Sequence, residues 1–123
     1  MQIGTDYLKT TELTITPMYR ARLDAAHDDE TALTNVFTGR PARGLMNRLM
    51  REIGPLAAEA PAFPIAGGAL APLKQAAESQ GSADFSSLWS GQAAALAKPM
   101  GAFDLTRALA EDALKRLGQL AAG

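Results

Sequence analysis

Apolar residues recur at three- and four-residue intervals along most of the chain, the spacing that places them on one face of an α-helix. The pattern predicts helices over residues 16–26, 44–53, 72–81, 84–96 and 103–120. Thr16 followed by Pro17 is a favourable helix start, because threonine caps the first turn and proline fits the first helical position. Residues 31–38 are rich in β-prone side chains and predict a short strand.

The periodicity also predicts which side chains face the interior. In residues 16–26 these are Met18, Ala21, Leu23 and Ala25, and in residues 44–53 they are Leu45, Met46, Leu49, Met50 and Ile53. Two side chains outside the predicted helices are also expected to be buried, Phe63 and Ile65. The last two belong to residues 55–71, which are rich in Pro, Ala and Gly and are predicted to cross the surface. In the last helix, Leu105, Leu109, Ala113 and Leu117 form an apolar stripe.

The first residues are predicted to be the end of a strand that passes into a loop or a short helical turn. They are Gln2, Ile3, Gly4 and Thr5. A glycine at a strand end lets a phosphate approach the backbone closely, and the next amide and the threonine hydroxyl can donate to its oxygens. A plain turn is the commoner role of a Gly-Thr pair. A chain that begins inside a strand is expected to be a piece of a larger phosphate-cofactor enzyme.

Composition narrows the classes of function. The chain has 123 residues, of which 47% are hydrophobic and 20% charged, as in ordinary soluble domains. Its net charge of -1 gives no field that would attract nucleic acid or a membrane. The absence of cysteine excludes disulfides and thiolate chemistry, and the single histidine excludes a two-imidazole site. No signal peptide or membrane span is expected, so the default location is the cytoplasm.

A second candidate site is the glycine-rich turn at residues 37–44, with the sequence Phe-Thr-Gly-Arg-Pro-Ala-Arg-Gly. Arg40 and Arg43 have the paired donors that bind carboxylate or phosphate. The favoured alternative is a rigid surface turn whose arginines pair with local acids such as Asp28 or Glu30. Nucleic acid is disfavoured as a partner, because no aromatic residues alternate with these arginines.

A third candidate is Leu-Trp-Ser-Gly-Gln at residues 88–92. If it is helical, Gly91 costs about 1 kcal/mol relative to alanine, which indicates close packing or a ligand. The Gln92 amide is suited to a polar ligand, and packing around Trp89 is an equally good explanation. His27 follows a predicted helix and precedes an acidic run, so it is expected to be an exposed helix-end residue. We predict no catalytic residue and no metal ligand.

These segments, in this order and at this spacing, resemble the C-terminal part of the nitronate monooxygenase family, formerly called 2-nitropropane dioxygenases. The resemblance also includes Asn47-Arg48 and Asp84-Phe85. It implies a flavin enzyme with a TIM-like barrel and an added helical segment. Such enzymes bind FMN and oxidise alkyl nitronates with oxygen to carbonyl compounds and nitrite. It also implies that Gln2, Ile3, Gly4 and Thr5 belong to the FMN phosphate site.

The pattern along the chain predicts a mainly α fold class as the chain stands, with four to five helices and one or two short strands. The resemblance implies that this is a C-terminal fragment of an α/β TIM-like barrel with its added helical segment. Residues 1–15 would hold the end of the last barrel strand and the phosphate loop, and residues 16–123 the helical C-terminal segment. A TIM barrel takes about 250 residues, and the family's catalytic histidine has no counterpart here. We therefore expect no activity alone and a missing N-terminal barrel portion as partner. The alternative is a non-enzymatic helical module that binds a partner through an apolar face.

Overall fold

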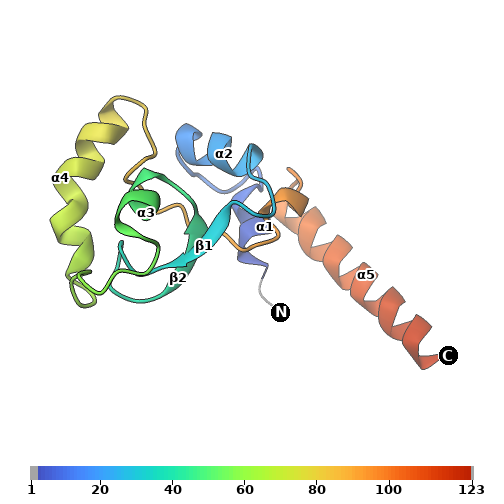
Figure 1. Cartoon of the computed structure of the whole chain (residues 1–123). Helices are drawn as coiled ribbons and strands as arrows, with labels where there is room; N and C mark the ends of the chain where they lie inside the picture. The colour runs from blue at the N-terminus through green and yellow to red at the C-terminus, as the bar shows by residue number, and fades with distance from the viewer. Residues whose placement is uncertain (1–2, 123) are drawn as a thin grey trace.

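The computed structural model describes residues 3–122, which form five α-helices, one 3-10 helix and a two-stranded sheet (Figure 1). In chain order the elements are α1 (Gly4–Leu8), α2 (Pro17–Asp24), β1 (Thr31–Thr34), β2 (Ala42–Leu45), α3 (Arg48–Ile53), α4 (Ala66–Ser79), η1 (Ala94–Leu96) and α5 (Ala102–Ala121). The mainly helical class is confirmed. From Gly4 onward the first segment is a short helix, and the strand predicted before it stays a prediction because Gln2 lies outside the described residues.

An extended segment at residues 88–90 lies beside β2, so the hairpin gains a third, irregular member. β1 and β2 pair antiparallel, with Thr31 opposite Leu45. On the other edge of β2, the Leu45 N–H donates to the Leu88 carbonyl at 2.9 Å, and the Ser90 N–H donates to the Arg43 carbonyl at 3.1 Å. The helix predicted over residues 84–96 is therefore wrong. In a helix, the backbone N–H and C=O groups of this segment would bond to one another. Here the second edge of β2 bonds to them instead.

The helix predicted over residues 44–53 begins only at Arg48. Asn47 precedes it in an extended conformation, and its side chain accepts a hydrogen bond from the Met50 N–H at 3.2 Å. Such a cap fixes the start of a helix. Residues 44–45 belong to β2 instead, where Gly44 leaves room for the neighbouring segment: a Cβ there would lie 2.9 Å from the Leu88 carbonyl oxygen.

Helix α4 starts six residues earlier than predicted, and Pro72 lies inside it. Proline removes one helical hydrogen bond. On the side of α4 that faces the core, Ala66 is buried and Leu70 packs against a core cluster. The segment before α4 was predicted to bury Phe63 and Ile65, but these side chains are 50% and 68% exposed. That prediction is wrong.

Two buried clusters form the core. One contains Leu23, Ala26, Leu45, Leu88 and Ala94. The other contains Val36, Phe37, Leu49, Met50 and Ala57. Leu23 is thus buried as predicted, whereas Ala21 and Ala25 are exposed. The buried side of α2 packs against η1 and the 88–90 segment, and much of the rest of the helix surface is uncovered.

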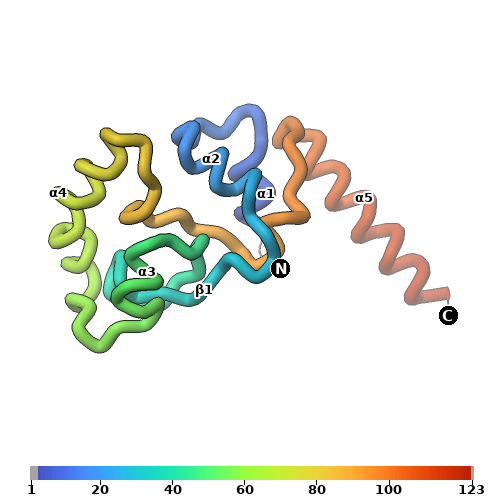
Figure 2. Tube along the Cα trace, turned by 45° about the horizontal axis from the view of Figure 1, so that its top comes forward, coloured from blue at the N-terminus to red at the C-terminus, as the bar shows by residue number. Residues whose placement is uncertain are grey.

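Helix α5 extends away from the rest of the chain in both views (Figures 1 and 2). It is held at its first turns, where Leu105 is buried. Of the apolar stripe predicted on this helix, Leu117 is 62% exposed, and the neighbouring Leu114 and Leu120 are 70% and 79% exposed. The amphipathic helix is real, but most of its apolar face is uncovered. No helix in residues 3–122 is both long and apolar enough to cross a membrane.

Candidate functional site

The three segments singled out in the sequence meet at one open cavity of about 580 Å³. Its walls come from α1, α2, β2 and the 88–90 segment with the residue after it. The lining residues are Gly4, Thr5, Leu8, Tyr19, Arg43, Trp89, Ser90 and Gly91. These segments lie up to 86 residues apart in the chain. The fold therefore gathers at this cavity residues that were selected independently of one another.

Thr5 and Gly91 join two of these segments directly. The Gly91 N–H donates to the Thr5 hydroxyl oxygen at 2.7 Å. A Cβ at position 91 would lie 3.3 Å from the same oxygen, so glycine allows the close approach. Gly91 is not in a helix, contrary to the prediction, and its lack of a side chain serves contact with Thr5.

The four residues predicted to bind phosphate are placed as follows. Gln2 lies outside the described residues. Ile3 is half-buried, and its carbonyl accepts the Asp6 N–H at 3.1 Å in the first turn of α1. Gly4 is exposed at the cavity, and a Cβ there would meet nothing within 4 Å. Thr5 is half-buried in the cavity wall.

The turn at residues 37–44 is held by contacts other than the ion pairs expected. Arg40 lies over the Phe63 ring, 4.5 Å from its centroid. Arg43 donates from Nη1 to the carbonyl and the hydroxyl of Thr31, each at 3.1 Å. Within the described part of the chain neither arginine forms an ion pair with Asp28 or Glu30, so that expectation is wrong. Arg43 remains in the cavity wall.

Gly39 explains the shape of this turn. Its φ is +85°, a conformation that side-chain-bearing residues rarely adopt. A Cβ there would lie 2.4 Å from both the Phe63 amide nitrogen and the Pro61 carbonyl oxygen. The backbone before α4 thus crosses directly over Gly39. The glycines of the motif serve chain crossings, and Arg43 is the member that reaches the candidate site.

Tyr19 is a site residue that sequence reasoning missed. Its hydroxyl donates to the Trp89 carbonyl, and its ring lines the cavity. Burial raises the pKa of Tyr19 to about 12, so the hydroxyl stays protonated at neutral pH. Met18 and Ala21 were the helix positions chosen by periodicity. The combination of an apolar ring with a polar hydroxyl is the sequence signal that could have marked Tyr19.

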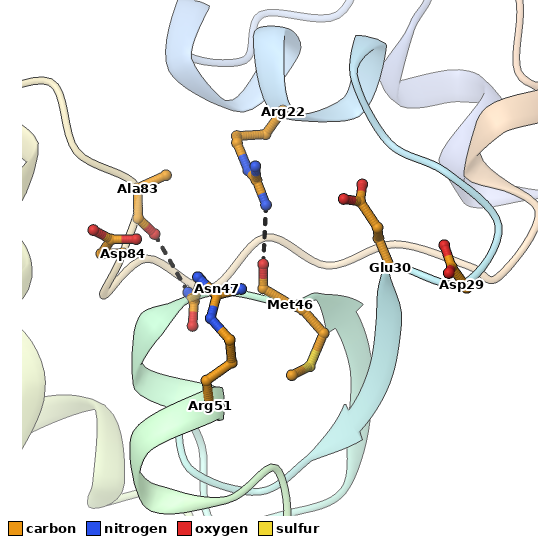
Figure 3. Close-up of a pocket in the computed structure, with 8 residues that line it drawn as sticks. All are labelled: Arg22, Asp29, Glu30, Met46, Asn47, Arg51, Ala83 and Asp84. Carbon is orange, nitrogen blue, oxygen red and sulfur yellow. Dashed lines mark hydrogen bonds between the residues drawn. The ribbon is translucent and has the colours of Figure 1, made fainter.

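A second cavity, of about 380 Å³, lies between α2, α3 and the segment at residues 82–84 (Figure 3). Arg22 points into it from α2 and donates to the Met46 carbonyl at 2.9 Å. The Asn47 amide donates to the Ala83 carbonyl at 3.3 Å on its other side. Its remaining walls carry both acidic and basic groups. These contacts tie α2 and the 82–84 segment to the start of α3, which is a structural role.

His27 and Gln92 line a third, open cavity and both side chains are exposed. The backbone N–H of His27 donates to the Glu30 carboxylate at 3.1 Å. Helix α2 ends at Asp24 with Ala25 as its C-cap, so His27 lies in the loop beyond the helix and not at its end as predicted. No group of three metal-ligating side chains occurs among the residues described.

Comparison with known proteins places the chain in one family. The family model for nitronate monooxygenase matches residues 1–112. A nitronate monooxygenase from Pseudomonas aeruginosa is 36% identical over 113 residues, which cover 91% of this chain and 32% of that protein. A probable nitronate monooxygenase from Staphylococcus saprophyticus is 31% identical over 120 residues, covering 98% of this chain and 33% of that protein.

A solved structure agrees with the sequence relatives. The crystal structure of a nitroalkane oxidase from Streptomyces ansochromogenes superposes with a TM-score of 0.82 at 37% identity. The match covers 97% of this chain and 34% of that one. The chain spans about a third of the length of the relatives it matches. It belongs to the nitronate monooxygenase family, of which it matches a C-terminal portion.

Proposed function

We propose that the chain is the C-terminal part of an FMN-dependent nitronate monooxygenase that converts alkyl nitronates to carbonyl compounds and nitrite. The observation that carries the proposal is the Thr5–Gly91 hydrogen bond of 2.7 Å, around which the segments of the family resemblance form one cavity. A family relationship alone would be compatible with a degenerate copy. A cavity assembled from those same segments supports a retained binding site.

The residues present fit the phosphate end of FMN. Gly4 is open to the cavity, since a Cβ there would meet nothing within 4 Å. The Thr5 hydroxyl can donate to a phosphate oxygen, and Arg43 brings a positive charge to the same wall. When bound, FMN would supply the redox chemistry of the reaction. In this proposal Gln2, Ile3, Gly4 and Thr5 belong to the phosphate site, where Gly4 and Thr5 hold and orient the phosphate.

We further propose that the chain alone is inactive. The cavity is open, and its wall offers no enclosure for an isoalloxazine ring. The partner in this proposal is the barrel portion, which makes up the remaining two thirds of the relatives' length. The uncovered apolar face of α5, which includes Leu114, Leu117 and Leu120, supports a missing neighbour.

A chimera tests the proposed site. The part of the Pseudomonas aeruginosa relative that this chain matches would be replaced by the chain, and bound flavin and nitronate-dependent oxygen uptake would be measured. We expect the chimera to retain FMN, and Thr5→Val to release most of it. A folded chimera whose Thr5→Val variant keeps full FMN occupancy would show that the phosphate site is wrong.

The chain alone provides the complementary test. We expect a colourless preparation with no nitronate-dependent oxygen uptake. A yellow preparation with turnover would overturn the proposed inactivity.

The exposed face of α5 also supports the second candidate, a non-enzymatic helical module that binds a partner. The two proposals differ at the cavity: the module requires an intact α5 but neither Thr5 nor Gly4. If the chimera binds no FMN while the chain retains a partner through α5, the module is the better description.

A further inference from the structure

Among the described residues, the Thr5 hydroxyl accepts a hydrogen bond but donates none. A hydroxyl offers one hydrogen and two acceptor lone pairs. The backbone N–H of Gly91 can only donate, so the Thr5 oxygen is the acceptor in the 2.7 Å bond. Among residues 3–122, no acceptor receives the Thr5 hydrogen, whereas Thr106 donates to the Ala102 carbonyl and Thr10 to the Tyr7 carbonyl, both at 2.8 Å. The Thr5 hydrogen is therefore available to a group in the cavity.

The Gly91 amide is itself fixed from two directions. The preceding residue, Ser90, donates its N–H to the Arg43 carbonyl of β2 at 3.1 Å. The carbonyl of Trp89 accepts from the Tyr19 hydroxyl on α2. The absence of a Cβ at position 91 permits the approach to Thr5. Strand β2 and helix α2 thus set the direction of the Gly91 N–H. That direction determines which lone pair of the Thr5 oxygen is occupied.

We infer that Gly91 is a positioning residue that aims the Thr5 hydroxyl, as a hydrogen-bond donor, at an anionic phosphate oxygen in the cavity. This inference rests on the proposed phosphate site. Occupying one lone pair of the hydroxyl restricts its rotation and leaves the hydrogen directed elsewhere. A hydrogen bond to an anionic acceptor is stronger than one between neutral groups, so the correct rotamer adds directly to phosphate affinity.

The experiment is a titration of the ¹⁵N-labelled chain with inorganic phosphate, followed by amide chemical shifts, with potassium chloride of equal ionic strength as control. Phosphate is the probe because it requires only this end of the site. We expect shifts centred on Gly4 and Thr5. Gly91→Val, which displaces the amide, should weaken phosphate binding by about tenfold, as should Thr5→Val.

The double variant distinguishes an effect of Gly91 on the orientation of the Thr5 hydroxyl from a general disturbance of the fold. If Gly91 acts through Thr5, Gly91→Val should add little to Thr5→Val, because the interaction it controls is already gone. Gly68→Ala is the matched control, since a Cβ there meets nothing within 4 Å. Thr5→Ser should retain phosphate affinity because it keeps the hydroxyl. Should Gly91→Val lose its dispersed spectrum, Gly91→Ala, with its 3.3 Å contact, gives the same comparison with less disturbance.

Each result has one interpretation. A tenfold loss in both single variants without further loss in the double variant supports the inference. Unchanged affinity in the Gly91 variants, or additive losses, would overturn it while leaving the phosphate site in place. No phosphate response at Gly4 or Thr5 in the unmodified chain would remove the site itself, and the inference with it.

Discussion

The carboxylate of Glu12 accepts the backbone N–H of Ala102, with 3.0 Å to one oxygen and 2.9 Å to the other. The two residues lie 90 positions apart, and Ala102 is the first residue of α5. The loop after α1 therefore supplies the cap that Gly101, with no side chain, cannot provide to α5. Because the cap is charged, the attachment of α5 depends on the ionisation of one carboxyl group.

We predict that Glu12→Gln loosens the start of α5 and removes an acid dependence of its attachment. The Ala102 amide holds the pKa of Glu12 below its usual 4.5. A lowered folded-state pKa means that the stabilising contribution is present above 4.5 and is lost as the pH falls through the folded-state pKa. Hydrogen exchange of the amides in the first turn of α5, measured from pH 6 to pH 3, checks this.

The matched control is Glu111→Gln, which removes an exposed partner of Arg107 in the middle of the same helix. It should leave exchange in the first turn unchanged. If both variants behave alike, the cap has no special role in holding α5.

A second prediction concerns Gly44, where a Cβ would lie 2.9 Å from the Leu88 carbonyl oxygen. The obstructing atom belongs to the backbone, so it cannot rotate away. Gly44→Ala should destabilise the chain by about 1–3 kcal/mol, the usual range for overpacking. Gly118→Ala, in the open on α5, should be neutral or gain up to about 1 kcal/mol, since alanine favours helices. Urea unfolding measures both, and equal stabilities would contradict the close approach of the two segments.

Gly44 lies where the sequence pattern and the structure disagree. Its flanking residues have helical spacing, and the sequence predicts a helix from this point. The structure instead places Gly44 and Leu45 in β2, which pairs with β1 on one edge and with the 88–90 segment on the other. Pairing with a segment more than 40 residues away leaves no local signal, which is why residues 88–90 have helical spacing although they pair with β2.

Local signals did predict the features that depend on neighbours in sequence. Thr16 caps α2 by accepting the Tyr19 N–H at 3.2 Å, as its position before Pro17 indicated. Asp104 lies in the first turn of α5, as its favourable position near the helix N-terminus indicated. The candidate site falls between these cases. Gly4, Thr5, Arg43 and Gly91 were each selected from short motifs, but only the fold brings them to one cavity.

A third prediction follows from Tyr19. Tyr19→Phe should cost about 1 kcal/mol, because it leaves the half-buried Trp89 carbonyl without its donor. The effect should also depend on alkaline pH. The pKa is raised to about 12 from 10.0, so the contribution is complete below 10 and is lost as the pH rises towards 12. Denaturant unfolding of both forms from pH 8 to pH 11.5 checks the trend.

Tyr7→Phe is the control for this prediction, since the Tyr7 hydroxyl pairs with Thr106 at the exposed surface. It should lose less stability at neutral pH than Tyr19→Phe does. A Tyr19→Phe variant that keeps the same loss of stability above pH 10 as the unmodified chain would show that Tyr19 is not its source.

The last prediction concerns the uncovered face of α5. Leu114 and Leu117 are 70% and 62% exposed, so they contribute little to the stability of the isolated chain but offer apolar surface to a dye or a partner. The double variant Leu114→Gln with Leu117→Gln should sharply reduce binding of an apolar fluorescent dye, while the free energy of unfolding changes by no more than about 0.5 kcal/mol per site.

Leu105→Gln, at the buried anchor of the same helix, should do the opposite: it should destabilise the chain by about 2 kcal/mol or more and raise dye binding. If the double variant binds dye as strongly as the unmodified chain, the exposed surface lies elsewhere and α5 would no longer support a missing neighbour. If it also blocks assembly with the barrel portion of a relative, the same leucines are the contact that the longer enzymes bury.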